Sequence, residues 1–309
     1  MRFIDAATVD RHMSWKKAVE IMRNGHLGKR PVLDDLLLQS GQGELLGRAV
    51  HLPEVGIGMK VASMYPPNRN SVPPKPTEDA LYILIREEDW RVDAVLSGPA
   101  VTRWKTAADS ALASSILSRP DSHSLLCIGA GPIAEALVEA HLSERPSIQE
   151  IMLWNRTPEK AEALRIRLEE KDIGAQVISD LNEAVGNAHI ITSATPSPEP
   201  VVKGAFVRPG THVDLVGGFS LAHREGDDEL VRKASIYVDN LASTVGHVGD
   251  IQSPIASGVM SQDDIRADLF ALVAEPDWRR DDDEITMYKN GGGAHLDLLI
   301  ARQVVLEID

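Results

Sequence analysis

Cysteine, aromatic residues and long apolar runs are all scarce in this chain of 309 residues. The one cysteine, Cys127, excludes an intrachain disulfide, and its place within an apolar run predicts a core position. Aromatic residues make up only 4% of the chain. No apolar run is long enough to span a membrane, and Met1 to Asp5 open the chain without the apolar segment of a secretory signal. We therefore expect a cytoplasmic protein with no membrane partner.

Basic residues are also in deficit, 32 against 46 acidic ones, which gives a formal net charge of −14. This charge argues against nucleic acid as a partner. The histidines at 212, 223 and 247 are too scattered to form a metal-ligand set, so no metal is predicted. The apolar fraction of 43% is that of a globular protein, and the length allows two domains.

The most informative motif is a glycine turn that links an apolar run to a helical pattern. It reads Gly129, Ala130, Gly131, Pro132, Ile133 and Ala134. In a dinucleotide-binding fold the first glycine allows a tight turn and the second lets the backbone approach a pyrophosphate. Pro132 departs from the usual form of this motif. The alternative interpretation is a plain strand–helix turn.

Strands and helices alternate around this motif. Six apolar segments are expected to be strands: 125–129, 151–155, 176–179, 189–194, 212–216 and 236–239. Helices are expected at 133–142 and 158–171, the second with Thr157 as its N-cap. This repeat predicts an α/β fold, a doubly wound parallel sheet of the Rossmann type over residues 119–293.

Residues 1–118, joined by 294–309, are expected to form an α+β substrate-binding and dimerisation domain. Its predicted helices are 15–24, 102–117 and 294–305, and its predicted strands are 45–52, 57–64, 80–85 and 94–96. The short connection 87–90 favours a hairpin, so the sheet is expected to be antiparallel. Residues 65–76 hold five prolines and are expected to form a loop, either functional or merely solvated.

The end of the second predicted strand indicates which cofactor is bound. An NAD site normally has an acidic residue there, whereas this chain has Asn155, Arg156 and Thr157. Arg156 would form charge-assisted hydrogen bonds to a 2′-phosphate. The sequence therefore favours NADP(H), with NAD(H) as the weaker alternative. The alternative interpretation, that Arg156 is only a solvated residue at the start of a helix, stays open.

Several segments together resemble the ornithine cyclodeaminase/mu-crystallin family of NAD(P)-dependent enzymes. They are Gly58 to Lys60, Pro76-Thr77, Thr102 to Ala108, Gly129 to Ala134, Thr192 to Pro196, Gly210 to Gly217, Arg224-Glu225 and Ile285 to Ala294. The resemblance implies a Rossmann domain, a substrate domain whose sheet pairs between two subunits, and hence a homodimer.

The resemblance also implies the roles of individual residues. Arg30, Lys60, Thr77 and Lys105 would bind the substrate carboxylate. Beyond the glycine turn and Asn155 to Thr157, the implied cofactor contacts are Thr106, Ala194, Thr195, Val216, Gly217, Lys289 and Asn290. Alternatively, Lys60 lies on an exposed strand face and Arg30 in a solvated turn.

Two departures from the family pattern bear on the reaction. The family usually has arginine where this chain has Lys105, which keeps the charge but loses the bidentate fork. Its cyclodeaminases have an aspartate after the Val-Gly-Gly turn, where this chain has Phe219, which cannot accept a proton. Asp214 lies five residues earlier and is a candidate replacement base, or else a strand-end residue with local hydrogen bonds.

The missing base favours reduction of an imine over oxidation of an amine. We expect an NADPH-dependent reductase that converts Δ1-pyrroline-2-carboxylate or Δ1-piperideine-2-carboxylate to L-proline or L-pipecolate. Lys60 would also relay a proton to the nitrogen, although that role requires a cationic neighbour that lowers its pKa. The alternatives are an ornithine or lysine cyclodeaminase that uses Asp214, and an NADP(H)-binding protein with little turnover.

Overall fold

The computed structural model describes residues 2–73, 75–218, 220–275 and 277–308. Internal contacts divide the chain into a first unit, Met1–Lys105 with Gly293–Asp309, and a second unit, Thr106–Gly292. The division falls inside helix α3 (Gly98–Leu117) rather than after residue 118. Residues 106–117 of α3 belong to the second unit, in which the Ser110 hydroxyl donates to Asp214 at 2.8 Å.

The first unit is built on a six-stranded sheet in the order β1-β6-β5-β4-β3-β2. The strands are β1 (Arg2–Ile4), β2 (Val32–Ser40), β3 (Gly43–Leu52), β4 (Gly56–Met64), β5 (Glu78–Ile85) and β6 (Val92–Ser97). Its helices are α1 (Ala6–Arg11), α2 (Trp15–His26), the short η1 (Pro66–Asn70) and α11 (Ala294–Ile308). The pair β1–β6 is parallel and the other pairs are antiparallel, so the sheet is mixed, not purely antiparallel.

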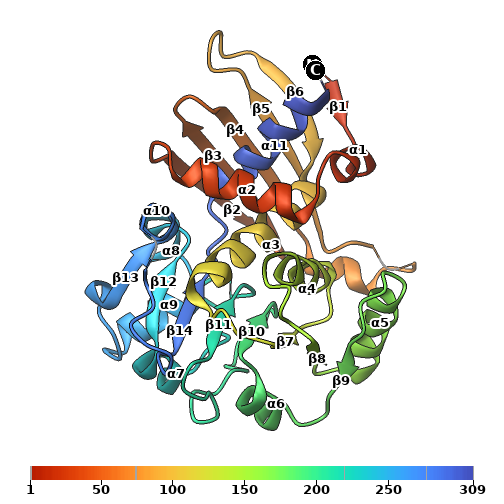
Figure 1. Cartoon of the computed structure of the whole chain (residues 1–309). Helices are drawn as coiled ribbons and strands as arrows, with labels where there is room; N and C mark the ends of the chain where they lie inside the picture. Colours follow the sequence, from red (N-terminus) through yellow and green to blue (C-terminus); the bar gives the residue numbers. More distant parts are fainter. Residues whose placement is uncertain (1, 74, 219, 276, 309) are drawn as a thin grey trace. The chain divides into compact units, whose positions relative to one another are not determined.

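The C-terminal helix α11 lies against β3, β4, β5 and α2 (Figure 1). Apolar side chains of this helix such as Leu298 and Val304 are buried, and its contacts assign the helix to the first unit. The predicted hairpin between β5 and β6 is present. The sequence did not reveal β2, because its run of three leucines lacks the alternation of a half-buried strand and it lies exposed at the sheet edge.

The second unit contains an eight-stranded parallel sheet in the order β13-β12-β14-β11-β10-β7-β8-β9. The strands are β7 (Ser124–Ile128), β8 (Glu150–Trp154), β9 (Gln176–Val177), β10 (Ile190–Ser193), β11 (His212–Leu215), β12 (Ser235–Val238), β13 (Ile265–Asp268) and β14 (Thr286–Lys289). The helices are α4 (Pro132–Glu144), α5 (Pro158–Glu169), α6 (Leu181–Asn187), α7 (Asp228–Lys233), α8 (Leu241–Thr244), α9 (Gly249–Ala256), η2 (Gln262–Asp264) and α10 (Leu269–Ala274). This arrangement confirms the predicted doubly wound Rossmann sheet.

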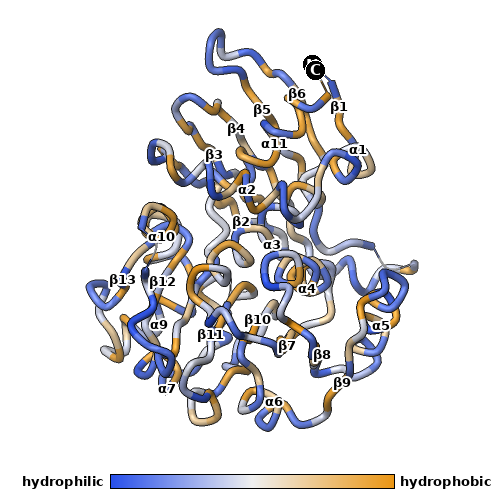
Figure 2. The backbone as a smooth tube through the Cα atoms, viewed as in Figure 1, coloured by the Kyte–Doolittle hydropathy of each residue, from blue (hydrophilic) through white to orange (hydrophobic). Residues whose placement is uncertain are grey.

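All six strands predicted for this unit are present, with ends shifted by one or two residues. Every residue of β7, β10 and β11 is buried, and Cys127 is a buried core residue as expected. In Figure 2 the hydrophobic colour appears along β10, whereas β11 alternates polar and apolar residues. The strands β13 and β14 were missed: β13 carries Arg266 and Asp268 within four residues, and β14 ends in Lys289.

Candidate functional site

The glycine turn lies where the strand order of the second unit reverses. The chain runs from β7 to β8 and β9 on one side, then returns to β10 on the other side of β7. Gly129 follows β7 with φ of 121°, and its amide donates to the carbonyl of Trp154 at 2.9 Å. A Cβ at Gly129 would lie 2.7 Å from the carbonyl oxygen of Ala194, which follows β10. The two loops therefore meet at the carboxyl edge, where such sheets bind ligands.

Pro132 fits this turn for a geometric reason. Gly131 is the N-cap of α4, with extended φ and ψ, and Pro132 occupies the first helical position. Proline is favoured there because its missing N–H would have no helical partner. No heavy atom lies within 4 Å of a Cβ built on Gly131. The exposed end of α4, with Ile133 in its first turn, fits a pyrophosphate.

Glu225 ties the loops that follow β10 and β11. Its carboxylate accepts from the Thr195 amide at 2.8 Å, the Thr195 hydroxyl at 2.9 Å and the Ser193 hydroxyl. It also accepts from the amide of Gly217, while the neighbouring Val216 amide donates to the Ser193 carbonyl at 2.8 Å. Burial raises the pKa of Glu225 to about 7 against the lowering effect of the Lys289 charge.

Lys289 lies inside the second unit rather than on a surface. It ends β14 with none of its side chain exposed, and its Nζ lies 3.1 Å from Asp250 Oδ2. The other oxygen of Asp250 accepts from the Glu225 and Gly226 amides at 2.7 and 3.1 Å. Lys289 therefore neutralises a buried carboxylate that supports Glu225.

Asn290 connects the loop after β14 to α3. Its Nδ2 donates to the Thr106 carbonyl at 3.0 Å and to the Ser110 hydroxyl at 3.1 Å, and its Oδ1 accepts from Gly292. Ser110 donates in turn to Asp214 at 2.8 Å. Thr106, Asn290 and Asp214 are thus joined in one hydrogen-bonded chain.

Asp214 has no exposed surface. Its carboxylate accepts from Ser110 and, at 2.7 Å, from Thr192. Burial raises the pKa of Asp214, and the nearby His141 and the two hydroxyls oppose that effect. This enclosure favours the interpretation of Asp214 as a residue with local hydrogen bonds. Phe219 lies outside the described residues.

The residues that follow β8 are exposed to different degrees. Asn155 is half-buried and donates to the Thr157 carbonyl at 2.9 Å, and Thr157 is the N-cap of α5. Arg156 is exposed, and no side chain pairs with it among the described residues. Its guanidinium is therefore available to an anion. No carboxylate stands among Asn155, Arg156 and Thr157.

The four residues predicted to bind a carboxylate all belong to the first unit. Lys60 lies on β4 and contacts Thr102 and Asp297. Lys105 is buried on α3, and Arg30 is exposed between α2 and β2. Thr77 directly precedes β5, and its carbonyl accepts from the Tyr65 amide. The cross-strand partner of Lys60 on β5 is Tyr82, further along the strand.

Sequence reasoning gave no role to Glu225, Asp250, Tyr82 or Asp297. Glu225 stands in the Arg224-Glu225 segment that resembles the family, and Asp250 and Asp297 stand alone in helical patterns. Their partners Lys289 and Lys60 are distant in the chain. No local signal identifies such pairs.

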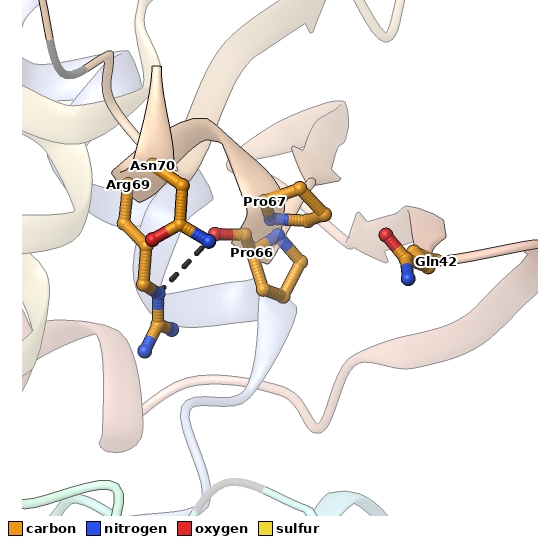
Figure 3. Close-up of a pocket in the computed structure, with 5 residues that line it drawn as sticks. All are labelled: Gln42, Pro66, Pro67, Arg69 and Asn70. Atoms are coloured by element: carbon orange, nitrogen blue, oxygen red, sulfur yellow. Dashed lines mark hydrogen bonds between the residues drawn. The ribbon is translucent and has the colours of Figure 1, made fainter. Parts of the chain in front are cut away.

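A separate hollow of about 430 Å³ lies in the first unit at the proline-rich loop. Figure 3 shows its lining, Gln42, Pro66, Pro67, Arg69 and Asn70. Arg69 Nε donates to the Pro66 carbonyl at 3.2 Å, so the loop holds its own guanidinium. None of the predicted site residues lines this hollow.

Two features are absent from the described part of the chain. No helix there is long and apolar enough to cross a membrane. No group of three or more His, Cys, Asp or Glu side chains there is arranged to hold a metal ion.

A doubly wound parallel sheet with a glycine turn at its switch point defines a dinucleotide-binding α/β protein. The model of the ornithine cyclodeaminase/mu-crystallin family matches residues 37–308. The chain belongs to this family, as its motifs predicted. It is a nicotinamide-dependent oxidoreductase.

Individual relatives cover nearly the whole chain. A Δ1-pyrroline-2-carboxylate reductase of Paracoccus denitrificans is 40% identical over 304 residues, which cover 98% of this chain and 96% of that protein. The solved structure of Thermococcus litoralis Δ1-pyrroline-2-carboxylate reductase, in complex with NADH and L-proline, has a TM-score of 0.93 at 28% identity and covers 100% of this chain and 98% of its own. An archaeal alanine dehydrogenase dimer with bound NAD has a TM-score of 0.89 at 28% identity, with coverages of 98% and 94%.

Proposed function

We propose that this chain is an NADPH-dependent reductase of cyclic imino acids. Its substrates would be Δ1-pyrroline-2-carboxylate and Δ1-piperideine-2-carboxylate, and its products L-proline and L-pipecolate. The observation that carries the proposal is the 40% identity, over nearly its full length, to a Δ1-pyrroline-2-carboxylate reductase. The enclosure of Asp214 supports it, because the candidate base for oxidising an amine is already engaged by two hydroxyls.

The first unit supplies cations for the substrate. Arg30, Lys60 and Lys105 would hold the carboxylate, and Thr77 would add a hydroxyl donor. Fixing the carboxylate orients C2 of the ring, which accounts for a large part of the rate of a two-reactant transfer. When bound, the reduced nicotinamide supplies a hydride to C2. Lys60 would donate a proton to the nitrogen as the C=N double bond becomes a C–N single bond, and water would restore that proton.

The second unit would hold the dinucleotide. The pyrophosphate fits the exposed end of α4 after Gly131, and the loops with Ala194, Thr195, Val216 and Gly217 would flank it. Lys289 and Asn290 would support this site from beneath through Asp250 and Ser110. Arg156 supports a preference for NADPH. The NADH in the Thermococcus litoralis complex makes NADH the alternative to test.

A homodimer is proposed from the free edge of the first sheet. Strand β2 ends the strand order and exposes apolar side chains on both faces, with Leu36 61% and Leu37 54% exposed. An exposed apolar edge strand is a template for pairing with another chain. A Leu36→Lys/Leu38→Lys double variant should elute as a monomer in light-scattering chromatography, where the wild type elutes as a dimer. A monomeric wild type would refute the dimer.

The function is tested by NADPH consumption at 340 nm with five- and six-membered cyclic imino acids, and by ammonia release from ornithine. The proposal expects consumption with the imino acids and no ammonia. Ammonia without imine reduction would establish a cyclodeaminase. Tight NADPH binding without turnover of either would establish a binding protein. Lys60→Ala should abolish turnover and leave NADPH binding intact.

A further inference from the structure

Lys60 is held from two directions within the first unit. Its Nζ donates to Thr102 Oγ1 at 2.5 Å and lies 3.4 Å from Asp297 Oδ1. The Thr102 hydroxyl donates to the carbonyl of Gly98 at 2.8 Å, so it serves Lys60 as an acceptor. An ammonium has three N–H donors. Two are used inside the unit, and one is left for another molecule.

Asp297 is almost completely enclosed, with 1% of its side chain exposed against 13% for Lys60. It lies in the first turn of α11, where the helix dipole favours a negative charge. Its second oxygen, Oδ2, accepts no hydrogen bond among the described residues. A buried carboxylate lowers the stability of the fold unless a positive charge pairs with it. The ion pair therefore neutralises Asp297 and also holds the Lys60 ammonium in place.

Tyr82 lies on the same face. It is the cross-strand partner of Lys60, and its hydroxyl lies so close to Gly58 that a Cβ there would stand 2.0 Å away. This hydroxyl is buried and has no partner among the described residues. Burial and the charge of Asp297 raise the pKa of Tyr82, so the phenol keeps its proton. A buried donor without a partner lowers stability, and a role in the site would explain its presence.

We propose that Asp297 is a positioning residue for imine reduction, which orients the Lys60 ammonium with the Tyr82 hydroxyl beside it. This rests on the proposed function. The two internal contacts direct the third N–H of Lys60 outward, where it would donate to the imine nitrogen. As C2 gains the hydride, the π electrons of C=N form the new N–H bond with that proton. The Lys60 amine then takes a proton from water while Asp297 keeps it in place.

The test compares Asp297→Asn, Asp297→Glu and Tyr82→Phe with a matched control. The control is Asp93→Asn, because Asp93 also pairs with α11, through Arg302 at 3.6 Å, and its ion pairs are with arginines rather than with Lys60. We expect Asp297→Asn to lower kcat about 100-fold, as a misplaced reacting group does, with the NADPH dissociation constant unchanged. Asp297→Glu should restore part of kcat, and Tyr82→Phe should lower kcat without lowering the unfolding midpoint. Asp93→Asn should leave kcat unchanged.

The proposal is overturned if Asp297→Asn lowers the unfolding midpoint and leaves kcat at the wild-type value, or if Asp297→Glu and Asp297→Asn lose kcat equally. Failure of the proposed function is a different result, in which the wild type consumes no imino acid. In that case the labelling of Lys60 by an amine-reactive reagent, followed by peptide mass spectrometry, still tests the positioning. Labelling should be faster in Asp297→Asn than in Asp93→Asn, and equal rates would reject it.

Discussion

Glu225 and Thr195 are joined twice, because the carboxylate of Glu225 accepts from both the amide and the hydroxyl of Thr195. The same carboxylate reaches the Gly217 amide on the next loop. Two loops at the carboxyl edge of the sheet are therefore fixed by a single side chain. Charge on that side chain strengthens every one of these bonds, while burial opposes the charge.

The pKa of Glu225, raised by burial to about 7, predicts a pH dependence of stability. In the unfolded chain this carboxyl titrates near 4.5. The folded state therefore binds the extra proton between pH 4.5 and 7, and the stability it contributes below that window is lost as the pH rises through it. The unfolding midpoint of the wild type should fall from pH 5 to pH 8 more than that of Glu225→Gln. Glu229→Gln, which removes an exposed pair with Lys233, is the control and should keep the wild-type slope. Equal slopes in all three proteins would contradict the prediction.

Arg156→Ala should weaken NADPH and spare NADH. A hydrogen bond to a charged group contributes about 1.5–3 kcal/mol, which corresponds to roughly a 10- to 100-fold rise in the KM for NADPH. The matched control is Arg165→Ala on the helix α5 that follows Arg156, because Arg165 pairs with Glu162 and Glu169 on the surface. Steady-state kinetics with both cofactors would decide. An equal loss for NADPH and NADH in Arg156→Ala would refute contact with the 2′-phosphate.

Asp214→Asn distinguishes a supporting residue from a base. If Asp214 only accepts hydrogen bonds from Ser110 and Thr192, the Asp214→Asn variant should lose about 1–3 kcal/mol of unfolding free energy. Its kcat should stay within a few-fold of the wild-type value. Ser110→Ala removes one of the same bonds and should give a similar loss of stability. Denaturant unfolding and imine reduction provide the two measurements. A loss of kcat of more than about 100-fold with normal stability would restore Asp214 as the base.

Lys289→Met leaves the buried Asp250 without its cation. Removing one partner of a buried pair costs about 3–5 kcal/mol, so the unfolding free energy should fall by that amount. Lys171→Met is the comparison, since Lys171 forms exposed pairs with Glu135 and Glu139 and should cost less than about 1 kcal/mol. A stable Lys289→Met protein with a raised KM for NADPH would show instead that Lys289 acts on the cofactor.

The sequence predicted those parts of the fold whose signals are local. Continuous apolar runs such as Leu125 to Ile128 are strands because both faces are buried, and a glycine turn with a proline at the first helical position marks a helix start. The strand β14 was missed because it ends in a buried lysine. The ion pair with Asp250 allows Lys289 to be buried there. The residues around position 289 give no indication of this partner.

The candidate site was predictable to the same extent. Lys60 was identified from its segment, whereas Asp297, 237 residues away, was not. Asp297 lies on α11, whose side chains toward the sheet are mostly apolar. Only the folded chain brings Lys60 and Asp297 together. Residues that position another site residue from a distant part of the chain are therefore the ones that sequence reasoning misses.

Cys127 has a practical consequence. It is the sole thiol of the chain and is fully enclosed in β7, and burial raises its pKa to about 12. Because the thiolate is the reactive form, this sulfur should resist alkylation and oxidation in the native protein. Preparations should therefore not require a reducing agent. A cysteine introduced on an exposed helix such as α5 would be the single addressable position for a fluorophore or spin label.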